Sequence, residues 1–139
     1  MPAIFEHELT VSPAEIDSVG HVNNVEYLRW LQDAAIAHSA VQGWPPSRHR
    51  ELGHGWVVRS HSIEYRLPAY EGNQLVVRTW VASLARVTSL RRYEIIRRSD
   101  SAVLVTASTN WAYVYFDGHR PCRIPAEVAT AFEVVLDAE

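Results

Sequence analysis

The chain has 139 residues, 47% hydrophobic and 21% charged, which is enough to bury a core, and we expect a single domain over residues 1–139. A net charge of -3 provides no general attraction to nucleic acid, and we expect no nucleic-acid partner. All 13 basic residues are arginine, which excludes Walker A phosphate binding and lysine Schiff-base chemistry on this chain.

The N-terminal part of the chain predicts a strand, a loop and a long helix. Segment 5–12 has the composition of a strand and is followed by a proline that begins a loop. Over 23–42, apolar side chains recur at helical spacing on two faces and a polar stripe follows a third. Asn23 or Asn24 is a good N-cap, and Gly43 ends the pattern. The wide apolar surface predicts that other elements cover most of this helix.

Four strand-like runs follow a loop over 44–55, with turn residues between them. Alternating apolar and polar residues within the runs predict a sheet with one buried face, and an antiparallel meander is the simplest arrangement. A short helix is expected from Pro125 to about Val135. A long helix buried by a curved antiparallel sheet is an α+β fold. The four runs span residues 56–66, 74–85, 88–98 and 102–116.

The composition also indicates a cellular setting. The N-terminus lacks a basic start followed by an apolar run, and no apolar stretch reaches about 18 residues, so we expect a soluble cytoplasmic protein without membrane insertion. The single cysteine, Cys122, cannot form an intrachain disulfide and is expected to be passive. The seven histidines show no metal-binding spacing, and we expect neither a metal nor a cofactor.

The segment just before the long helix carries a candidate site. From Ile16 to Tyr27 it reads Ile-Asp-Ser-Val-Gly-His-Val-Asn-Asn-Val-Glu-Tyr, which places Asp17 in a glycine-containing turn. A helix N-terminus offers unpaired N–H donors and partial positive charge, which can receive a developing oxyanion. A carboxylate at this place predicts a small acyl-transfer site, with Asp17 as candidate base or nucleophile.

The pattern Asp-x-x-Gly-His-Val-Asn-Asn-x-x-Tyr, from Asp17 to Tyr27, resembles the signature of the hotdog-fold thioesterases, in particular the 4-hydroxybenzoyl-CoA thioesterase-like group and its acyl-ACP relatives. Segment 63–75 is similar to the family's second-to-third strand hairpin, and 120–126 resembles its closing segment. The resemblance implies a hotdog fold, in which an antiparallel sheet of about five strands wraps one long central helix. It also implies assembly into a homodimer or homotetramer.

The resemblance assigns roles to residues of this motif. In the family, the aspartate acts as nucleophile or general base, and the backbone N–H seven residues later polarises the thioester carbonyl; here these are Asp17 and the N–H of Asn24. Two roles are open for His21. It helps to orient Asp17 or to position water, or it is a histidine of the turn that is hydrogen-bonded to the backbone. Many relatives carry Arg-x-x-Asp-x-Asp before the glycine, whereas this chain lacks the arginine and has Glu15 in place of the first aspartate. The loop that carries Asp17 must therefore be held differently from the loop of those relatives. Glu26, on a helix where some subgroups place their catalytic base, is expected on the solvated face.

Arginines and tryptophans supply candidate substrate contacts. Arg86, Arg91 and Arg92 surround an expected turn between strands, where their guanidinium groups either meet the phosphates of coenzyme A or protect a solvated sheet edge. Trp44 and Trp56 flank the loop after the long helix, and either is a candidate for lining an acyl or aryl pocket.

Together these features predict a thioesterase that hydrolyses a fatty-acyl or aryl thioester of CoA, or of acyl carrier protein, to free acid and thiol. A non-catalytic acyl-CoA-binding module is the alternative. Asp17 separates the two, because a binding module needs no carboxylate aimed at the carbonyl. A hotdog dehydratase is disfavoured, since the different His or Asp arrangement that it would use is not found.

Overall fold

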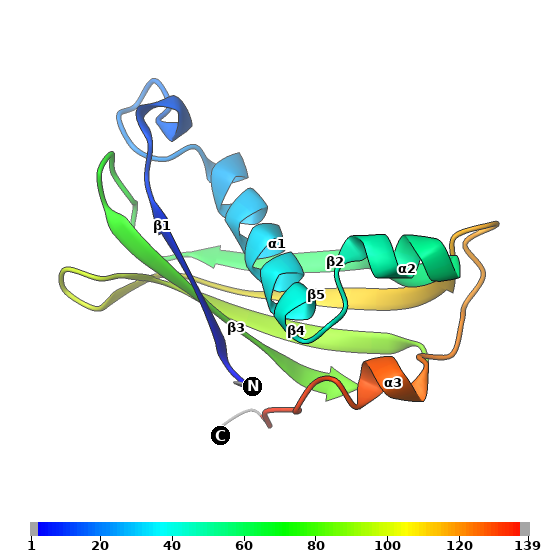
Figure 1. Ribbon diagram of the computed structural model, residues 1–139. Helices are drawn as coiled ribbons and strands as arrows, with labels where there is room; N and C mark the ends of the chain where they lie inside the picture. Colours follow the sequence, from blue (N-terminus) through cyan, green and yellow to red (C-terminus); the bar gives the residue numbers. More distant parts are fainter. Residues whose placement is uncertain (1–2, 137–139) are drawn as a thin grey trace.

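The computed structural model describes residues 3–136, which form a five-stranded antiparallel sheet curved around one long helix (Figure 1). The predicted α+β class is therefore confirmed. The strands are β1 (Phe5–Thr10), β2 (His54–Tyr65), β3 (Gln74–Leu84), β4 (Thr88–Arg97) and β5 (Ala102–Tyr115). The helices are the 3-10 helix η1 (Pro13–Glu15), α1 (Asn24–Val41), α2 (Pro46–Leu52) and α3 (Ala126–Ala129).

Helix α1 begins and ends within a residue of its predicted bounds. The Asn23 side chain caps it by accepting a hydrogen bond from the Val25 N–H at 3.1 Å. Gly43, with a φ of 94°, follows its last turn and takes a backbone conformation that other residues rarely adopt. The sheet covers one broad face of α1, so the helix holds the preceding loop at a defined place over the sheet. Its buried residues are Tyr27, Trp30, Leu31, Ala34, Ala35 and His38.

The strand order is β1-β3-β4-β5-β2, so the predicted meander holds only for β3, β4 and β5. The predicted hairpin over 63–75 is wrong, because β2 pairs with β5. The connection 66–73 is too long for a tight hairpin, and β1 occupies the place beside β3 that β2 would have taken. This connection packs instead against the start of α1, where Val22 N–H donates to the Ala69 carbonyl at 2.9 Å and Ala69 N–H donates to the Tyr27 hydroxyl at 3.0 Å.

The expected loop over 44–55 contains helix α2, so that prediction is wrong. Pro46 at the first helical position and Gly53 as the left-handed C-cap are ordinary start and end signals for a short helix. α2 lies beside the C-terminal end of α1 and covers the start of β2 (Figure 1). α3 is shorter than predicted, because the chain after Ala129 leaves the helix and Val135 N–H donates to the Val81 carbonyl of β3.

The edges of the sheet differ in length. β1 has 6 residues and pairs with β3, whereas β2 has 12 residues and pairs with β5. Within residues 3–136, the outer side of β2 faces no other strand. A long unpaired edge is a template for a further strand, which matters below for how copies of the chain associate.

Candidate functional site

The loop before α1 is closed on itself. Ile16 and Val22 form a β-bridge, and Asp17 N–H donates to the His21 carbonyl at 2.9 Å. Gly20 turns the chain with a φ of 95°, in the left-handed region that favours glycine. The glycine of the sequence motif is therefore explained by backbone conformation, and the closed loop fixes where the Asp17 side chain starts.

The Asp17 carboxylate is held by one oxygen and accessible at the other. Oδ1 accepts a hydrogen bond from Val19 N–H at 2.9 Å, while Oδ2 lies 3.7 Å from His21 Nδ1. The Asp17 and His21 side chains are 25% and 37% exposed. His21 Nδ1 also lies 3.4 Å from the Val22 carbonyl, so His21 lies beside both the carboxylate and the backbone. A carboxylate oxygen anchored on one side and open on the other is suited to approach by water or a substrate.

The first turn of α1 leaves one backbone donor open. Asn23 accepts from Val25 N–H through its side chain and from Glu26 N–H through its carbonyl, the latter at 2.9 Å. The N–H of Asn24, the first helical residue, makes no hydrogen bond within residues 3–136. An open N–H at the positive end of a helix dipole is a place for a polarised carbonyl oxygen.

Glu15 ties this loop to α1. The resemblance to the family motif did not predict this role. Its Oε1 accepts from Ser12 N–H at 2.8 Å, and its Oε2 accepts from the Trp30 indole N–H at 2.9 Å. Its carbonyl accepts from Asn23 N–H at 3.0 Å. The spacing Ser12-x-x-Glu15 is that of a capping box, which was the available sequence signal. The glutamate that stands in place of the relatives' aspartate thus supports the loop.

We expect Glu15→Gln to lower the free energy of unfolding by about 1.5–3 kcal/mol. The neutral amide keeps one acceptor oxygen, but its NH2 group then faces either the Ser12 N–H or the Trp30 indole N–H, both of which are donors. Urea unfolding followed by tryptophan fluorescence measures the change. Glu64→Gln is the control, since Glu64 is 70% exposed and its carboxylate lies 3.5 Å from the exposed Arg66 guanidinium. Equal stability of the two variants would show that Glu15 does not support the loop.

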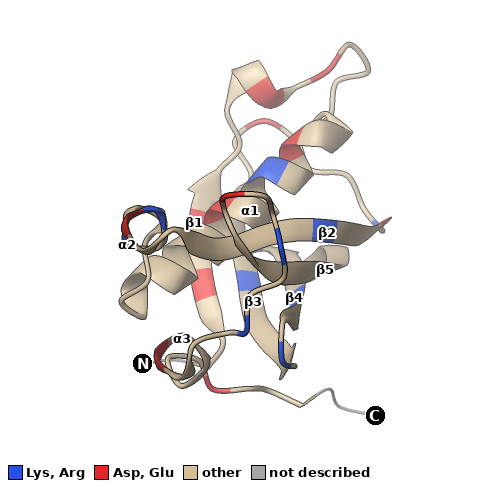
Figure 2. Ribbon diagram, turned by 90° about the vertical axis from the view of Figure 1, so that its right-hand side faces the viewer, with Lys and Arg blue, Asp and Glu red and all other residues tan. Residues whose placement is uncertain are grey.

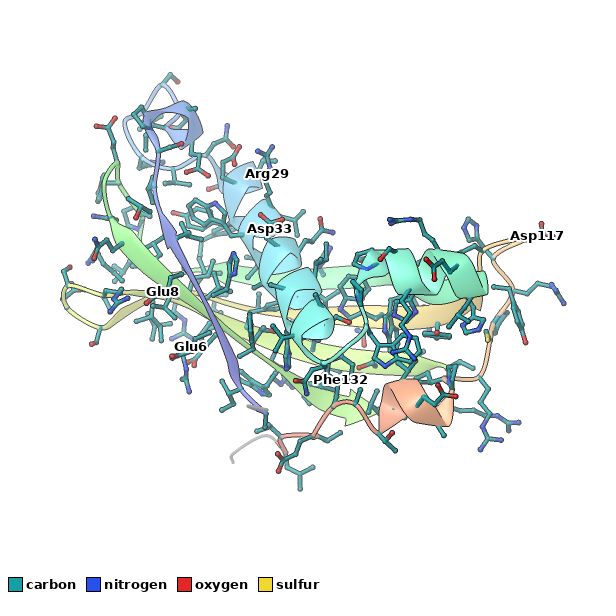
Figure 3. All side chains as sticks on the ribbon, viewed as in Figure 1. Glu6, Glu8, Arg29, Asp33, Asp117 and Phe132 are labelled. Carbon is teal, nitrogen blue, oxygen red and sulfur yellow. The ribbon has the colours of Figure 1, made fainter. Side chains whose placement is uncertain are left out.

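Glu26 is less exposed than predicted. Its side chain is 15% exposed and its Oε2 lies 3.4 Å from Arg29 Nη1, so the solvated interpretation is wrong for this residue. Arg29 and Asp33 do lie exposed along α1 (Figure 3). The stripe is therefore polar throughout but half-buried at its N-terminal end.

A cavity of about 490 Å³ lies between the C-terminal half of α1, α2 and the inner face of the sheet. This volume is typical of small-molecule sites. Trp44 and Trp56, the two tryptophans singled out in the sequence, both line it. Arg91, Ser89 and His49 are polar groups of its wall. Most of the remaining wall is apolar and is formed by Ala35, Ile36, Val57, Val58, Val81, Leu84, Trp111, Phe116 and Phe132.

Burial lowers the pKa values of two polar groups that line this cavity. Burial lowers the pKa of His49, which is therefore biased toward its neutral form, and its Nδ1 lies 3.2 Å from the Tyr113 hydroxyl. Burial also lowers the pKa of Arg91, to about 10. Arg91 Nη1 donates to His38 Nδ1 at 2.9 Å and to Thr79 Oγ1 at 3.1 Å. Arg91 still carries its charge at neutral pH.

The structure does not bring the three predicted arginines together. Arg91 is 6% exposed and lines the cavity on the inner face. Arg92, the next residue of β4, lines a polar depression with Trp80 and Glu94 on the other face. Arg86 is exposed in the turn between β3 and β4. Neighbouring strand residues point to opposite faces, so the expectation of one phosphate-binding cluster from all three is wrong.

The predicted site residues form two groups at different ends of α1. Asp17, His21 and Asn24 lie at its N-terminal end, whereas Trp56 and Arg91 belong to the cavity. Along the helix axis, Asn24 is about 12–22 Å from the cavity-lining segment 32–39. Within one chain, the carboxylate and the cavity are therefore separate.

A metal site, a charged binding surface and a membrane-spanning helix each have features that can be sought among the described residues. No group of three or more His, Cys, Asp or Glu side chains within 3–136 is arranged to hold a metal ion. Basic and acidic residues are spread over several elements and do not gather on one face in the view of Figure 2. None of the helices within 3–136 has the length and apolar character needed to cross a membrane. Cys122 is buried and free.

Residues 11–132 match the Thioesterase-like superfamily. The chain belongs to this family. A proposed esterase from Aquifex aeolicus (strain VF5) is 28% identical over 137 residues, which are 99% of this chain and 100% of that protein. The resemblance drawn from the Asp17 motif is confirmed, and so is the predicted class of enzyme, a thioester hydrolase.

Solved structures of low identity share the hotdog fold. Slr0204, a 1,4-dihydroxy-2-naphthoyl-CoA thioesterase from Synechocystis, has a TM-score of 0.86 at 20% identity, covering 92% of this chain and 94% of its own. SAV2348 from Staphylococcus aureus, solved in complex with CoA, has a TM-score of 0.88 at 14% identity, covering 98% of this chain and 90% of its own. The arrangement of sheet and helix in this family member is therefore that of a known CoA thioesterase and of a protein solved with CoA.

Proposed function

We propose that this protein is an acyl-CoA thioesterase in which Asp17 and the N–H of Asn24 carry the reaction. The observation that carries the proposal is the Asn24 N–H, which makes no hydrogen bond within residues 3–136 and lies at the start of α1 beside a loop that presents an anchored, accessible carboxylate. Membership of the Thioesterase-like superfamily supports the reaction class, and the relatives that act on or bind CoA compounds support the carrier.

In the proposed reaction, the thioester carbonyl oxygen accepts the Asn24 N–H, which favours the negative charge that develops there. Asp17 either takes a proton from a water molecule that attacks the carbonyl carbon, or attacks it directly to form an anhydride that water then hydrolyses. The C–S bond breaks, the thiolate leaves with the electron pair, and it receives a proton. Because thiolate is a good leaving group, little acid catalysis is needed.

We propose further that two copies associate through their β2 edges. The outer side of β2 is long and faces no strand within residues 3–136. A two-fold axis makes the two β2 strands antiparallel. The C-terminal end of β2 is near the start of α1, since the Tyr65 hydroxyl donates to the Asn24 carbonyl at 3.3 Å. The N-terminal end of β2 carries the cavity residues Trp56 and Val57.

This association would unite the two separated groups of residues. Antiparallel β2 edges bring the Tyr65 end of one strand beside the cavity end of the partner's strand. The Asp17 loop of one subunit would then face the cavity of the other, which would hold the acyl group. Arg86, exposed at the β3–β4 turn next to cavity residues Leu84 and Ser89, would be free to meet the CoA phosphates outside.

A hydrolysis screen tests this function. Purified protein is offered acyl-CoA thioesters of increasing chain length, aryl-CoA thioesters, and one shared acyl group on acyl carrier protein, and free thiol is measured. We expect turnover of CoA thioesters and a dimer or tetramer by light scattering at micromolar protein. Tight binding of acyl-CoA without thiol release would favour the binding-module alternative, and a monomer would contradict the shared site.

A further inference from the structure

Arg91 is a buried cation that pairs with no acidic residue within residues 3–136. Its side chain is 6% exposed, and its hydrogen-bond partners, His38 and Thr79, are both reached through Nη1. Phe132 lies against the guanidinium, 5.9 Å from ring centroid to Cζ. Within residues 3–136, no carboxylate forms an ion pair with Arg91, and Nε and Nη2 make no hydrogen bond.

The cavity beside Arg91 is positively charged as well as apolar. No aspartate or glutamate of residues 3–136 lines it, whereas a second arginine, Arg50, lies at its wall on α2. Burying a charge in apolar surroundings is unfavourable unless an opposite charge or several hydrogen bonds compensate it. An apolar side chain of similar size would fill this position at lower cost. The buried guanidinium is therefore best explained by a ligand group that it binds.

Resting on the proposed thioesterase function, we infer that the preferred acyl group carries a carboxylate at its far end and that Arg91 binds this carboxylate inside the cavity. The substrate class is then the CoA monothioester of a dicarboxylic acid, aliphatic or aromatic. A carboxylate matches the two open donors of the guanidinium, Nε and Nη2, and both of its oxygens are paired in this geometry. The apolar wall accepts the hydrocarbon between the carboxylate and the thioester.

Matched substrate pairs test the inference in the unmodified protein. We compare adipyl- with hexanoyl-CoA, suberyl- with octanoyl-CoA, and 4-carboxybenzoyl- with 4-methylbenzoyl-CoA, each by thiol release. For the pair whose length fits, we expect kcat/KM to be about 30-fold or more higher for the carboxylate member, as for a buried charge pair. A higher kcat/KM for the uncharged member of every pair would overturn the inference and leave the thioesterase function standing.

Substitutions then assign the effect to Arg91. Arg91→Met keeps the length without the charge and is expected to abolish the preference for the carboxylate member while retaining hydrolysis of the uncharged one. Arg91→Lys is expected to restore part of the preference. Arg92→Met, one residue along on the opposite face, is the matched control and should leave the preference unchanged. A similar loss on both members in Arg91→Met would show that Arg91 serves the fold alone.

A binding measurement separates this inference from the proposed function. Isothermal calorimetry with free suberate needs no turnover, and we expect binding to the unmodified protein that Arg91→Met loses. If no thioester is hydrolysed, the thioesterase proposal fails, and loss of suberate binding in Arg91→Met would still support the carboxylate site. Absence of suberate binding to the unmodified protein, or equal binding to Arg91→Met, would overturn the inferred carboxylate site. Circular dichroism confirms that each variant is folded.

Discussion

Asp17→Asn is expected to lower kcat for the preferred CoA thioester by about 100- to 10,000-fold, the usual contribution of a positioned general base. An amide is nearly isosteric with the carboxylate, and its oxygen can still accept the hydrogen bond from Val19 N–H that anchors the side chain. It neither takes a proton from water at neutral pH nor attacks a thioester effectively. Thiol-release kinetics measure the change, with circular dichroism as the check on folding.

Asp33→Asn is the matched control for this substitution. Asp33 is an exposed carboxylate on α1, away from the loop, and the same chemical change there is expected to leave kcat unaltered (Figure 3). If Asp17→Asn kept activity within about twofold of the unmodified enzyme, a base or nucleophile at this position would be ruled out on the usual magnitude of such groups.

Two inactive variants are expected to restore activity when they are combined in one dimer. Asp17→Asn removes the carboxylate, and Ser39→Trp fills the cavity from α1, where Ser39 lines its wall. If each site combines the Asp17 loop of one subunit with the cavity of the other, a heterodimer of the two variants has one site with both defects and one intact site. We therefore expect about half of the unmodified activity per dimer.

Two different affinity tags, one on each variant, isolate the heterodimer after co-expression. The substrate is the thioester that the unmodified enzyme prefers, and Ser39→Trp alone must first prove inactive on it. Tagged homodimers of each variant are the controls. An inactive heterodimer would mean that the loop and the cavity of the same subunit work together. That result would remove the shared site without touching the assignment of Asp17.

Local signals in the sequence were sufficient for the helix and the loop before it. Asn23 and Gly43 mark the ends of α1 through backbone hydrogen bonding and left-handed conformation, both of which depend on nearby residues alone. The turn at Gly20 and the open N–H of Asn24 follow from the same local chemistry. The Asp17 end of the candidate site was therefore predictable from the chain itself.

The cavity end of the candidate site depends on contacts between residues far apart in the chain. Alternation along β4 implies that Arg91 and Arg92 point to opposite faces, but which face is buried depends on the side that α1 covers. The place of β2 beside β5 depends on pairings between residues far apart in the chain, which no local pattern encodes. The loop that bears the carboxylate thus follows from local sequence signals, while long-range packing places a buried arginine in the cavity wall and leaves β2 at the edge of the sheet.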